Sequence, residues 1–216
     1  EELLGTGNVQ NVDLSLRGGG ENSSFMISGG YYDEEGMVQN SYFRRLSLRI
    51  NSDHRVGERF KIGQSLQLTS QRGNSLNTNS AQTGVLWSAI RFHPGLPVRY
   101  PDGSWGSSQV SGEFGDINNP IFTVSTEDEE NTSHRLLGNI NAELGIIGGL
   151  SLRANIGLDA TVSDNYGFNI IIDEQIRQND RNSLSRSYQE SYSVLSEYFL
   201  NYDEVFAQKH AVNLVA

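Results

Sequence analysis

Residues 134–162, HRLLGNINAELGIIGGLSLRANIGLDATV, decide the fold of this chain. Apolar and polar residues alternate through two arms, 136–146 and 150–162, and the pair Gly148-Gly149 separates the arms. Because successive side chains of a strand point to opposite faces, this alternation predicts two strands that each have one apolar and one polar face. Glycine readily adopts the positive φ of a tight turn, so the two arms are expected to form a hairpin.

Both arms are about twice as long as an ordinary soluble strand, which has about 5 or 6 residues. A tilted strand needs about 9–11 residues to cross a bilayer, and a protein without an apolar run of about 20 residues must cross as a closed β-barrel. We therefore predict an all-β fold, an antiparallel transmembrane β-barrel segment with lipid on its apolar side and the lumen on its polar side. The predicted lipid-facing residues are Ile140, Leu152, Ile156 and Leu158, and the predicted lumenal residues are Asn141, Arg153, Asn155 and Asp159.

The composition excludes several classes of protein. The chain has 216 residues, a formal net charge of −10 and no cysteine. Acidic surfaces repel phosphate backbones, so nucleic acid is not an expected partner. Without cysteine the chain forms no disulfide and no thiolate metal site. It opens with Glu1-Glu2, so no basic and apolar signal segment is visible in it.

Alternation of the same kind recurs along the chain and predicts about eight long strands. Their predicted ranges are 9–17, 25–32, 42–55, 60–70, 134–147, 150–163, 187–202 and 210–216. Residues 71–132 are expected to form a long loop that contains a short helix at 80–92, and residues 164–186 form a second irregular stretch. Short turns then lie at one end of the sheet and long loops at the other, as in outer-membrane barrels, although a soluble sandwich could produce the same series by chance.

Several stretches, taken in order, resemble the barrel of SusC/RagA-family TonB-dependent transporters. They are SGGYYDEEGMVQNSYFRRLSLRINSDHRVGERFKIGQSL at 28–66, AIRFHPGLPVRYPDGSW at 89–105 with Asn118, Asn119 and Pro120, RLLGNINAELGIIGGLSLRANIGLD at 135–159, and SEYFLNYDEVFAQKHAVNLVA at 196–216. No single piece is as specific as a metal-ligand signature. The order of the pieces matches the family as well, and the resemblance covers almost the whole chain.

The resemblance implies a function in the bacterial outer membrane. The family has a signal segment, a TonB-contacting segment, a plug domain and a barrel of 22 strands, so this chain is expected to be an internal barrel fragment. The family imports oligosaccharides, or peptides in some members. Its expected partners are therefore a SusD-like lipoprotein, TonB acting through a plug domain that this chain lacks, the oligosaccharide or peptide substrate, and outer-membrane lipid.

The long loop contains the candidate ligand-binding residues. Trp87 and Phe92 are expected to pack the loop against the barrel wall. Tyr100 and Trp105 flank the turn at 101–103, and aromatic rings of this kind stack on sugar rings. Asp102 and Arg99 could bond sugar hydroxyls beside them. A wall-packing loop without a ligand is the alternative interpretation. Functional residues often ride on loops that a rigid scaffold holds, so we expect this loop to shape an extracellular entrance.

No catalytic signature is present, so the chain is not expected to be an enzyme. The four histidines are dispersed and none lies in a metalloprotease motif, and no nucleophile elbow occurs. No cofactor is expected, although a calcium site at 128–130 is an alternative that lacks EF-hand spacing. Two other functions compete with transport. One is a self-contained eight-stranded barrel that acts as an anchor or adhesin, and the other is a soluble glycan-binding β-domain.

Overall fold

The computed structural model describes residues 2–74, 76–77, 84–107, 117–173 and 178–216, and its main element is one antiparallel sheet of eight strands. The strands are β1 (Asn8–Gly19), β2 (Ser23–Glu35), β3 (Tyr42–Val56), β4 (Phe60–Gly73), β5 (Asp128–Ile147), β6 (Leu150–Asn169), β9 (Ser183–Phe206) and β10 (His210–Val215), in that spatial order. The short strands β7 (Ile172–Asp173) and β8 (Gln178–Asn179) pair with each other between β6 and β9. The predicted all-β, antiparallel fold class is confirmed.

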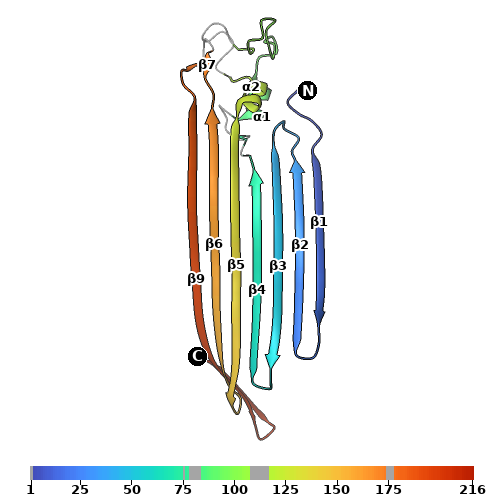
Figure 1. Ribbon diagram of the computed structural model, residues 1–216, viewed down its shortest axis with the longest axis vertical. Coiled ribbons are helices and arrows are strands. Elements are labelled where there is room, and N and C mark those ends of the chain that lie inside the picture. Colours follow the sequence, from blue (N-terminus) through green and yellow to red (C-terminus); the bar gives the residue numbers. More distant parts are fainter. Residues whose placement is uncertain (1, 75, 78–83, 108–116, 174–177) are drawn as a thin grey trace.

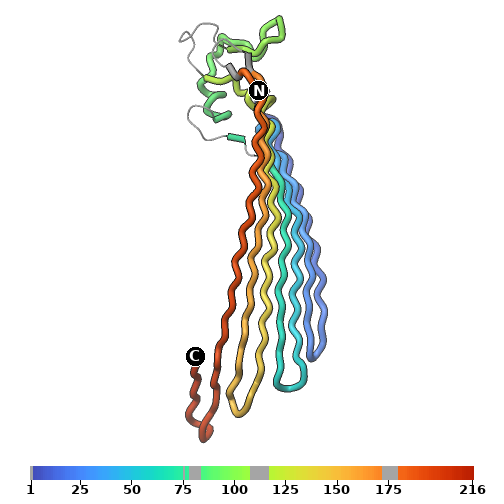
Figure 2. Tube along the Cα trace, turned by 60° about the vertical axis from the view of Figure 1, so that its left-hand side comes forward, coloured from blue at the N-terminus to red at the C-terminus, as the bar shows by residue number. Residues whose placement is uncertain are grey.

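Every strand of the main sheet pairs with its neighbour in sequence order, so the sheet is an open meander (Figure 1). The connections at 20–22, 57–59, 148–149 and 207–209 lie at one end, which we call the short-turn end. The connections at 36–41, 74–127 and 170–182 lie at the other, which we call the long-loop end. Seen from the side, the long strands follow one another in a single layer, and the long connections gather above them (Figure 2).

The strands extend further toward the long-loop end than the sequence predicts. The loop predicted at 71–132 is too long, because β4 continues to Gly73 and β5 already begins at Asp128. In the same way β6 and β9 occupy much of the stretch predicted to be irregular at 164–186. These strand ends are rich in charged, amide and hydroxyl residues and therefore show little apolar alternation. Their ladders nevertheless continue, and Asp128 pairs with Phe168.

The long strands have no buried apolar core. Among the described residues, the buried apolar side chains are Leu3, Val85, Phe122 and Val124, and all four lie at the long-loop end. On the strands, large apolar side chains stay exposed, and Ile140 and Ile156 are 53% and 50% exposed. Apolar surface of this extent is stable only when something covers it. The sheet therefore requires an apolar partner along one face.

Two short helices lie in the loop between β4 and β5. They are α1 (Val85–Arg91) and α2 (Pro120–Thr126). The start of the helix predicted at 80–92 lies outside the described residues. Helix α1 buries Val85 and Ser88 and leaves Ile90 77% exposed. A seven-residue helix buries only one narrow stripe, and Val85 packs with Leu3 and Val124. None of the described helices is long and apolar enough to cross a membrane.

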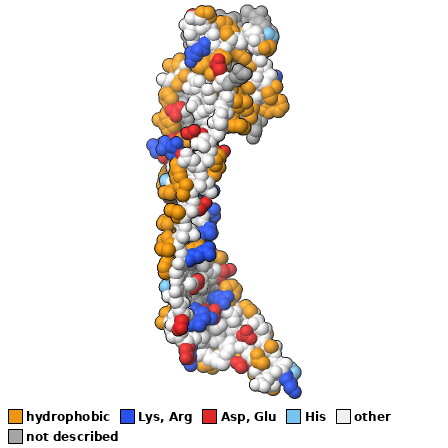
Figure 3. Space-filling view, turned by 90° about the vertical axis from the view of Figure 1, so that its right-hand side faces the viewer, with side chains coloured by type: hydrophobic (Ala, Val, Ile, Leu, Met, Phe, Trp, Pro, Cys, Tyr) orange, Lys and Arg blue, Asp and Glu red, His pale blue; other side chains and the backbone are white. Residues whose placement is uncertain are grey.

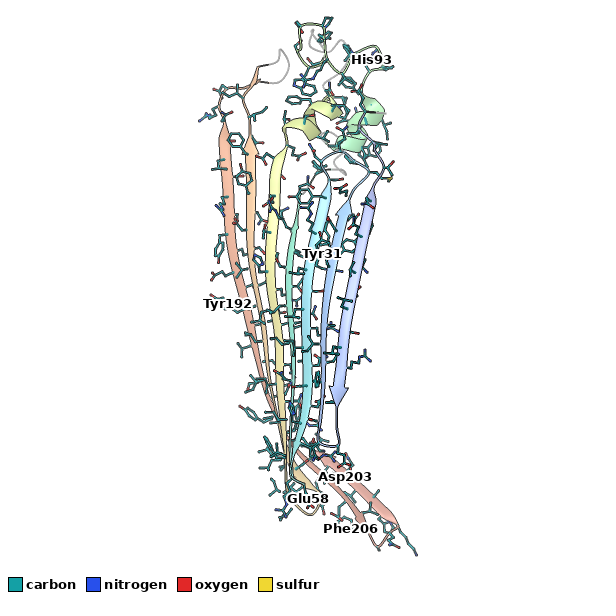
Figure 4. The ribbon with its side chains drawn as sticks, turned by 45° about the vertical axis from the view of Figure 1, so that its right-hand side comes forward. Tyr31, Glu58, His93, Tyr192, Asp203 and Phe206 are labelled. Carbon is teal, nitrogen blue, oxygen red and sulfur yellow. The ribbon has the colours of Figure 1, made fainter. Side chains whose placement is uncertain are left out.

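The turn between β9 and β10 contains backbone strain. Ala207 and Gln208 have φ angles of 50° and 55°, and Asp203 and Phe206 lie on the hairpin that bends away from the sheet (Figure 4). Two positive φ angles define a type I′ turn, which strongly favours Asn-Gly because residues with a Cβ are strained there. The strain amounts to about 1–2 kcal/mol for each residue in the left-handed region.

We predict that replacing Ala207→Asn and Gln208→Gly together stabilises this hairpin by about 1–2 kcal/mol, because both residues then suit a type I′ turn. The urea midpoint for unfolding of the full-length protein should rise. The control is Glu58→Gly in the β3–β4 turn, where φ is not positive and glycine relieves nothing. An equal rise of the urea midpoint in both variants would contradict the interpretation that Ala207 and Gln208 are strained.

Candidate ligand-binding faces and loop module

The two faces of the sheet differ in chemistry along their whole length. Viewed toward one edge, apolar side chains gather on one side and the charged side chains of the strands lie mostly on the other (Figure 3). We call the apolar side the outer face and the polar side the inner face. Arg153, Asn155 and Asn141 line one hollow on the inner face, and Asp159 lines another. The predicted separation of these four residues from Leu152, Ile156, Leu158 and Ile140 therefore agrees with the structure.

The inner face near the short-turn end is a charged cluster. Glu143 lies between two cations, at 3.1 Å from Lys61 Nζ and at 2.8 Å from an Arg153 guanidinium nitrogen. Asn155 donates to Glu197 over 2.9 Å and accepts from Asn139. These groups border a hollow of about 740 Å³. Because each pair spans neighbouring strands, the cluster fixes the positions of its side chains on the sheet.

The inner face near the long-loop end is rich in hydroxyl and amide groups and also carries Arg45, Arg135 and Asp159. One row across five strands runs through register partners Ser47, Thr69, Arg135, Thr161 and Ser191. These residues border a second hollow of about 680 Å³. Side chains that both donate and accept hydrogen bonds can bind many polar ligands, and they do not select one peptide sequence or one type of sugar ring.

The outer face is apolar in its middle and becomes polar near the long-loop end. Arg44 forms an ion pair with Asp33 at 3.1 Å, and Arg186 forms one with Asp164. Below these pairs, the Glu190 carboxylate accepts hydrogen bonds from the hydroxyls of two exposed tyrosines, Tyr188 at 2.8 Å and Tyr192 at 3.4 Å. A belt of tyrosines and paired charges therefore borders the apolar band, as in the interface girdles of membrane barrels.

The long loop is organised around one side chain, Asn119. Its side-chain nitrogen donates to the carbonyl oxygens of Val98 and Gly106 over 2.9 and 3.1 Å. Its side-chain oxygen accepts from the amides of Ile121 and Phe122 and so caps α2. Asn119 is only 5% exposed. It joins the segment at 94–107 to helix α2, and we call residues 84–107 and 117–127 the loop module.

The four predicted ligand residues lie together on one turn of this module. Arg99 and Trp105 form an isolated β-bridge, and the Arg99 guanidinium carbon lies 3.5 Å from the centre of the Trp105 ring. The Tyr100 hydroxyl donates to the Ser107 carbonyl oxygen over 3.1 Å. Asp102 accepts from the amide and hydroxyl of Ser104. The hydroxyl of Ser104, with its amide, holds the pKa of the exposed Asp102 carboxyl below its ordinary value.

These contacts define how the turn could meet a ligand. Trp105 also makes an edge contact with Phe122 at 5.3 Å between ring centres, so the indole already packs on both the guanidinium and a buried ring. A sugar that stacks on Trp105 must therefore displace Arg99 or stack on the guanidinium. Trp87 differs from the packing role predicted for it, because 47% of its side chain is exposed. Phe92 is half-buried.

The acidic run does not converge on one point. Asp128 and Glu130 alternate with Glu129 along β5, so Glu129 points to the opposite face. The Asp128 carboxylate accepts from the Tyr166 hydroxyl over 3.2 Å, and Glu130 accepts from Tyr42 and pairs with Arg72. Next to this run, burial raises the pKa of the Glu127 carboxyl, and the charge of Glu129 adds to the effect.

We predict that replacing Tyr100→Ala and Trp105→Ala together weakens binding of a stacked sugar by about 1–3 kcal/mol, if stacking on sugars compares with stacking on bases. The full-length protein, folded as shown by its heat-modifiable mobility, is titrated with its substrate. Tyr100→Phe is the control, because it removes only the hydroxyl and keeps the ring. Unchanged affinity in the folded double variant would remove both rings from the binding site.

A two-faced sheet with long and short connections at opposite ends defines a segment of a barrel wall, and relatives in sequence agree. No family profile matches the chain. TonB-dependent receptor P3 of Formosa agariphila is 29% identical over 165 residues, which are 74% of this chain and 16% of the receptor. TonB-dependent receptor P39 of the same organism is 25% identical over 207 residues, which are 95% of this chain and 19% of the receptor.

Solved structures show the same fold. The RagAB peptide transporter superposes with a TM-score of 0.75 at 21% identity, over 99% of this chain and 24% of the matched chain. The RagAB peptide importer in its 'closed-closed' state gives a TM-score of 0.74. The resemblance to a segment of SusC/RagA-family TonB-dependent receptors is therefore confirmed. The chain spans less than a quarter of the length of each protein described here.

Proposed function

We propose that this chain is part of the wall of an outer-membrane, TonB-dependent importer that takes up oligosaccharides or peptides. The observation that carries the proposal is the pair of opposite faces. On β6 the outer face is apolar at every second residue from Leu152 to Val162, which is about 34 Å along the strand. A strand tilted by about 40° would then span about 26 Å, close to the apolar band of about 25 Å in outer-membrane barrels.

The inner face supports the same function. A lumen through which a polar substrate passes needs many weak polar contacts rather than one tight site. The hydroxyl and amide row at Ser47, Thr69 and Ser191 provides such contacts near the long-loop end. The charged cluster around Glu143 lies near the short-turn end, where a plug domain supplied by the rest of the protein would pack. The loop module would then face outward, toward a SusD-like lipoprotein.

The competing functions receive less support. A self-contained eight-stranded barrel requires its first and last strands to pair, but β1 and β10 lie at opposite edges of an open sheet. A soluble glycan-binding domain requires a cover for the outer face, and on β1 the outward Leu14 and Leu16 are 73% and 63% exposed. A similar sheet occurs in the RagAB peptide importer. The choice between peptides and oligosaccharides is therefore tested directly.

The test is uptake by cells that express the full-length gene. Labelled oligosaccharide and peptide mixtures are supplied to wild-type cells, to cells without the gene and to cells without TonB. We expect uptake of one mixture to require both the gene and TonB. Co-purification of a lipoprotein with the full-length protein tests the partner. Uptake that is unchanged in both mutant strains would remove the proposed function.

A further inference from the structure

Arg45 and Arg49 are two inner-face arginines of β3 that form no ion pair among the described residues. The chain has a formal net charge of −10, yet the inner face near the long-loop end has three arginines, Arg45, Arg49 and Arg135, and Asp159 beside them. Asp159 holds Arg135 through two hydrogen bonds of 2.9 and 2.6 Å. Among the ion pairs between described residues, none involves Arg45 or Arg49. Both are exposed on this face.

Neutral neighbours hold both guanidinium groups in place. Arg45 lies over the Tyr32 ring at 5.4 Å from its centre, and the Tyr32 hydroxyl donates to Glu34 over 2.6 Å. Arg49 donates to the Gln67 side-chain oxygen over 2.7 Å. A guanidinium has five N–H donors, so each arginine keeps donors for a further acceptor. Positioning by neutral groups reduces the conformational entropy that a ligand must overcome.

The surface around the two arginines carries polar groups and also apolar ones, with Leu137, Leu158 and Leu195 in the wall of the smaller hollow. Arg45 and Arg49 are four residues apart on one face of β3, which is about 13 Å. Ser47 lies between them, beside Thr69 of β4. The hollows of about 680 and 510 Å³ share Gln67 and Asp159 in their walls, and their volumes fall within the usual range for ligand sites, about 300–1,000 Å³.

Lys61 and Arg153, the cations of the charged cluster at the short-turn end, differ from Arg45 and Arg49 in that both form ion pairs. There Lys61 and Arg153 share one ion-pair partner, the Glu143 carboxylate, so the charge of each is partly compensated. A compensated cation attracts an anionic ligand much less than an uncompensated one. Arg45 and Arg49 form no ion pair among the described residues, so each has more of its charge available to a ligand than Lys61 or Arg153.

We propose that Arg45 and Arg49 each provide a binding point for a carboxylate group of a hydroxyl- or amide-rich oligomer, and this inference rests on the importer function proposed above. A planar guanidinium binds a carboxylate through two parallel hydrogen bonds, while Ser47 and Thr69 bond the neutral groups beside it. An acidic oligosaccharide provides this chemistry through uronate units. A peptide provides it through its terminal carboxylate and its main-chain amides.

The test is binding to the full-length protein, measured by calorimetry in detergent. The charged probes are trigalacturonate and penta-alanine, and their neutral counterparts are maltotriose and penta-alanine amide. The variant is Arg45→Gln with Arg49→Gln. The matched control is Arg44→Gln with Arg72→Gln, which makes the same changes on the outer face and breaks exposed ion pairs of small energetic value.

We expect the inner-face variant to bind a charged probe at least tenfold more weakly, with neutral probes and the outer-face control unchanged. A loss for trigalacturonate alone assigns the oligosaccharide source, and a loss for penta-alanine alone assigns the peptide source. Equal binding of charged probes by variant and wild type, or a wild type without preference for charged over neutral probes, would overturn the subsite. TonB-dependent uptake that persists in that case leaves the importer function intact, whereas absence of all such uptake removes the function itself.

Discussion

Ile156→Arg is expected to destabilise the folded full-length barrel by about 2–4 kcal/mol, the cost of an arginine at a lipid-facing site near the bilayer midplane. Ile156 is 50% exposed on the outer face of β6 and pairs with Ile140 of β5. If that face meets lipid, the new guanidinium loses its hydration and finds no carboxylate among its apolar neighbours. Refolding into lipid vesicles at increasing urea concentration measures the change.

The neighbouring residue supplies the control. Asn155 lies next to Ile156 but on the inner face, where its side chain donates to Glu197 over 2.9 Å. Asn155→Arg places the same charge beside a carboxylate in a polar hollow, so we expect a change of less than about 1 kcal/mol. Equal losses for the two arginines would show that the outer face does not meet lipid.

The sequence alone predicts the strands wherever their two faces differ. Alternation of leucine and isoleucine with polar residues at 150–162 predicts β6 and the side to which Ile156 and Asn155 point. The same signal weakens where polar residues dominate both faces of the strand ends. The beginning of β5 at Asp128 and the end of β6 at Asn169 carry charged, amide and hydroxyl groups on both sides. Only the ladder with neighbouring strands reveals that these residues are extended.

The candidate site shows a similar limit. The sequence places Tyr100 and Trp105 beside a turn, and the structure does bring them together with Arg99 and Asp102. The sequence gives no sign that the Arg99 guanidinium covers the indole ring of Trp105, because a contact of that kind depends on the geometry of the turn. The sequence also does not single out Arg45, because the role of an arginine in a strand depends on its neighbours on adjacent strands, which the sequence does not show.

Asn119 is where the sequence and the structure are most informative together. The Asn-Pro pair is visible in the sequence as a family resemblance, and Pro120 at the first turn is a helix-start signal. The Asn119 side chain donates to two carbonyl oxygens and accepts from two backbone amides. Gly106 completes the junction, because a Cβ there would overlap the Pro97 carbonyl oxygen. The roles of Asn119 and Gly106 in packing the loop are therefore sufficient to account for the resemblance in this loop, without a ligand.

We predict that Asn119→Ala destabilises the loop module locally by about 2–4 kcal/mol. Each buried polar group left without a partner costs about 1–3 kcal/mol. This change removes the side-chain bond to the Gly106 carbonyl and the cap of two amides of α2, and the Val98 carbonyl keeps only its bond from the Gly106 amide. Hydrogen exchange of the full-length protein should accelerate in peptides that cover 98–107 and 119–126. The strands should keep their protection, because no ladder bond changes.

Asn119→Asp separates the two halves of this junction. The carboxylate can still accept from the amides of Ile121 and Phe122, so helix α2 keeps its cap. It cannot donate, and its charge faces the carbonyl oxygens of Val98 and Gly106. Exchange should therefore accelerate in 98–107 while 119–126 remains close to wild type. Equal acceleration in both peptides would show that the module opens as a unit and that Asn119 does not act through two separate sets of bonds.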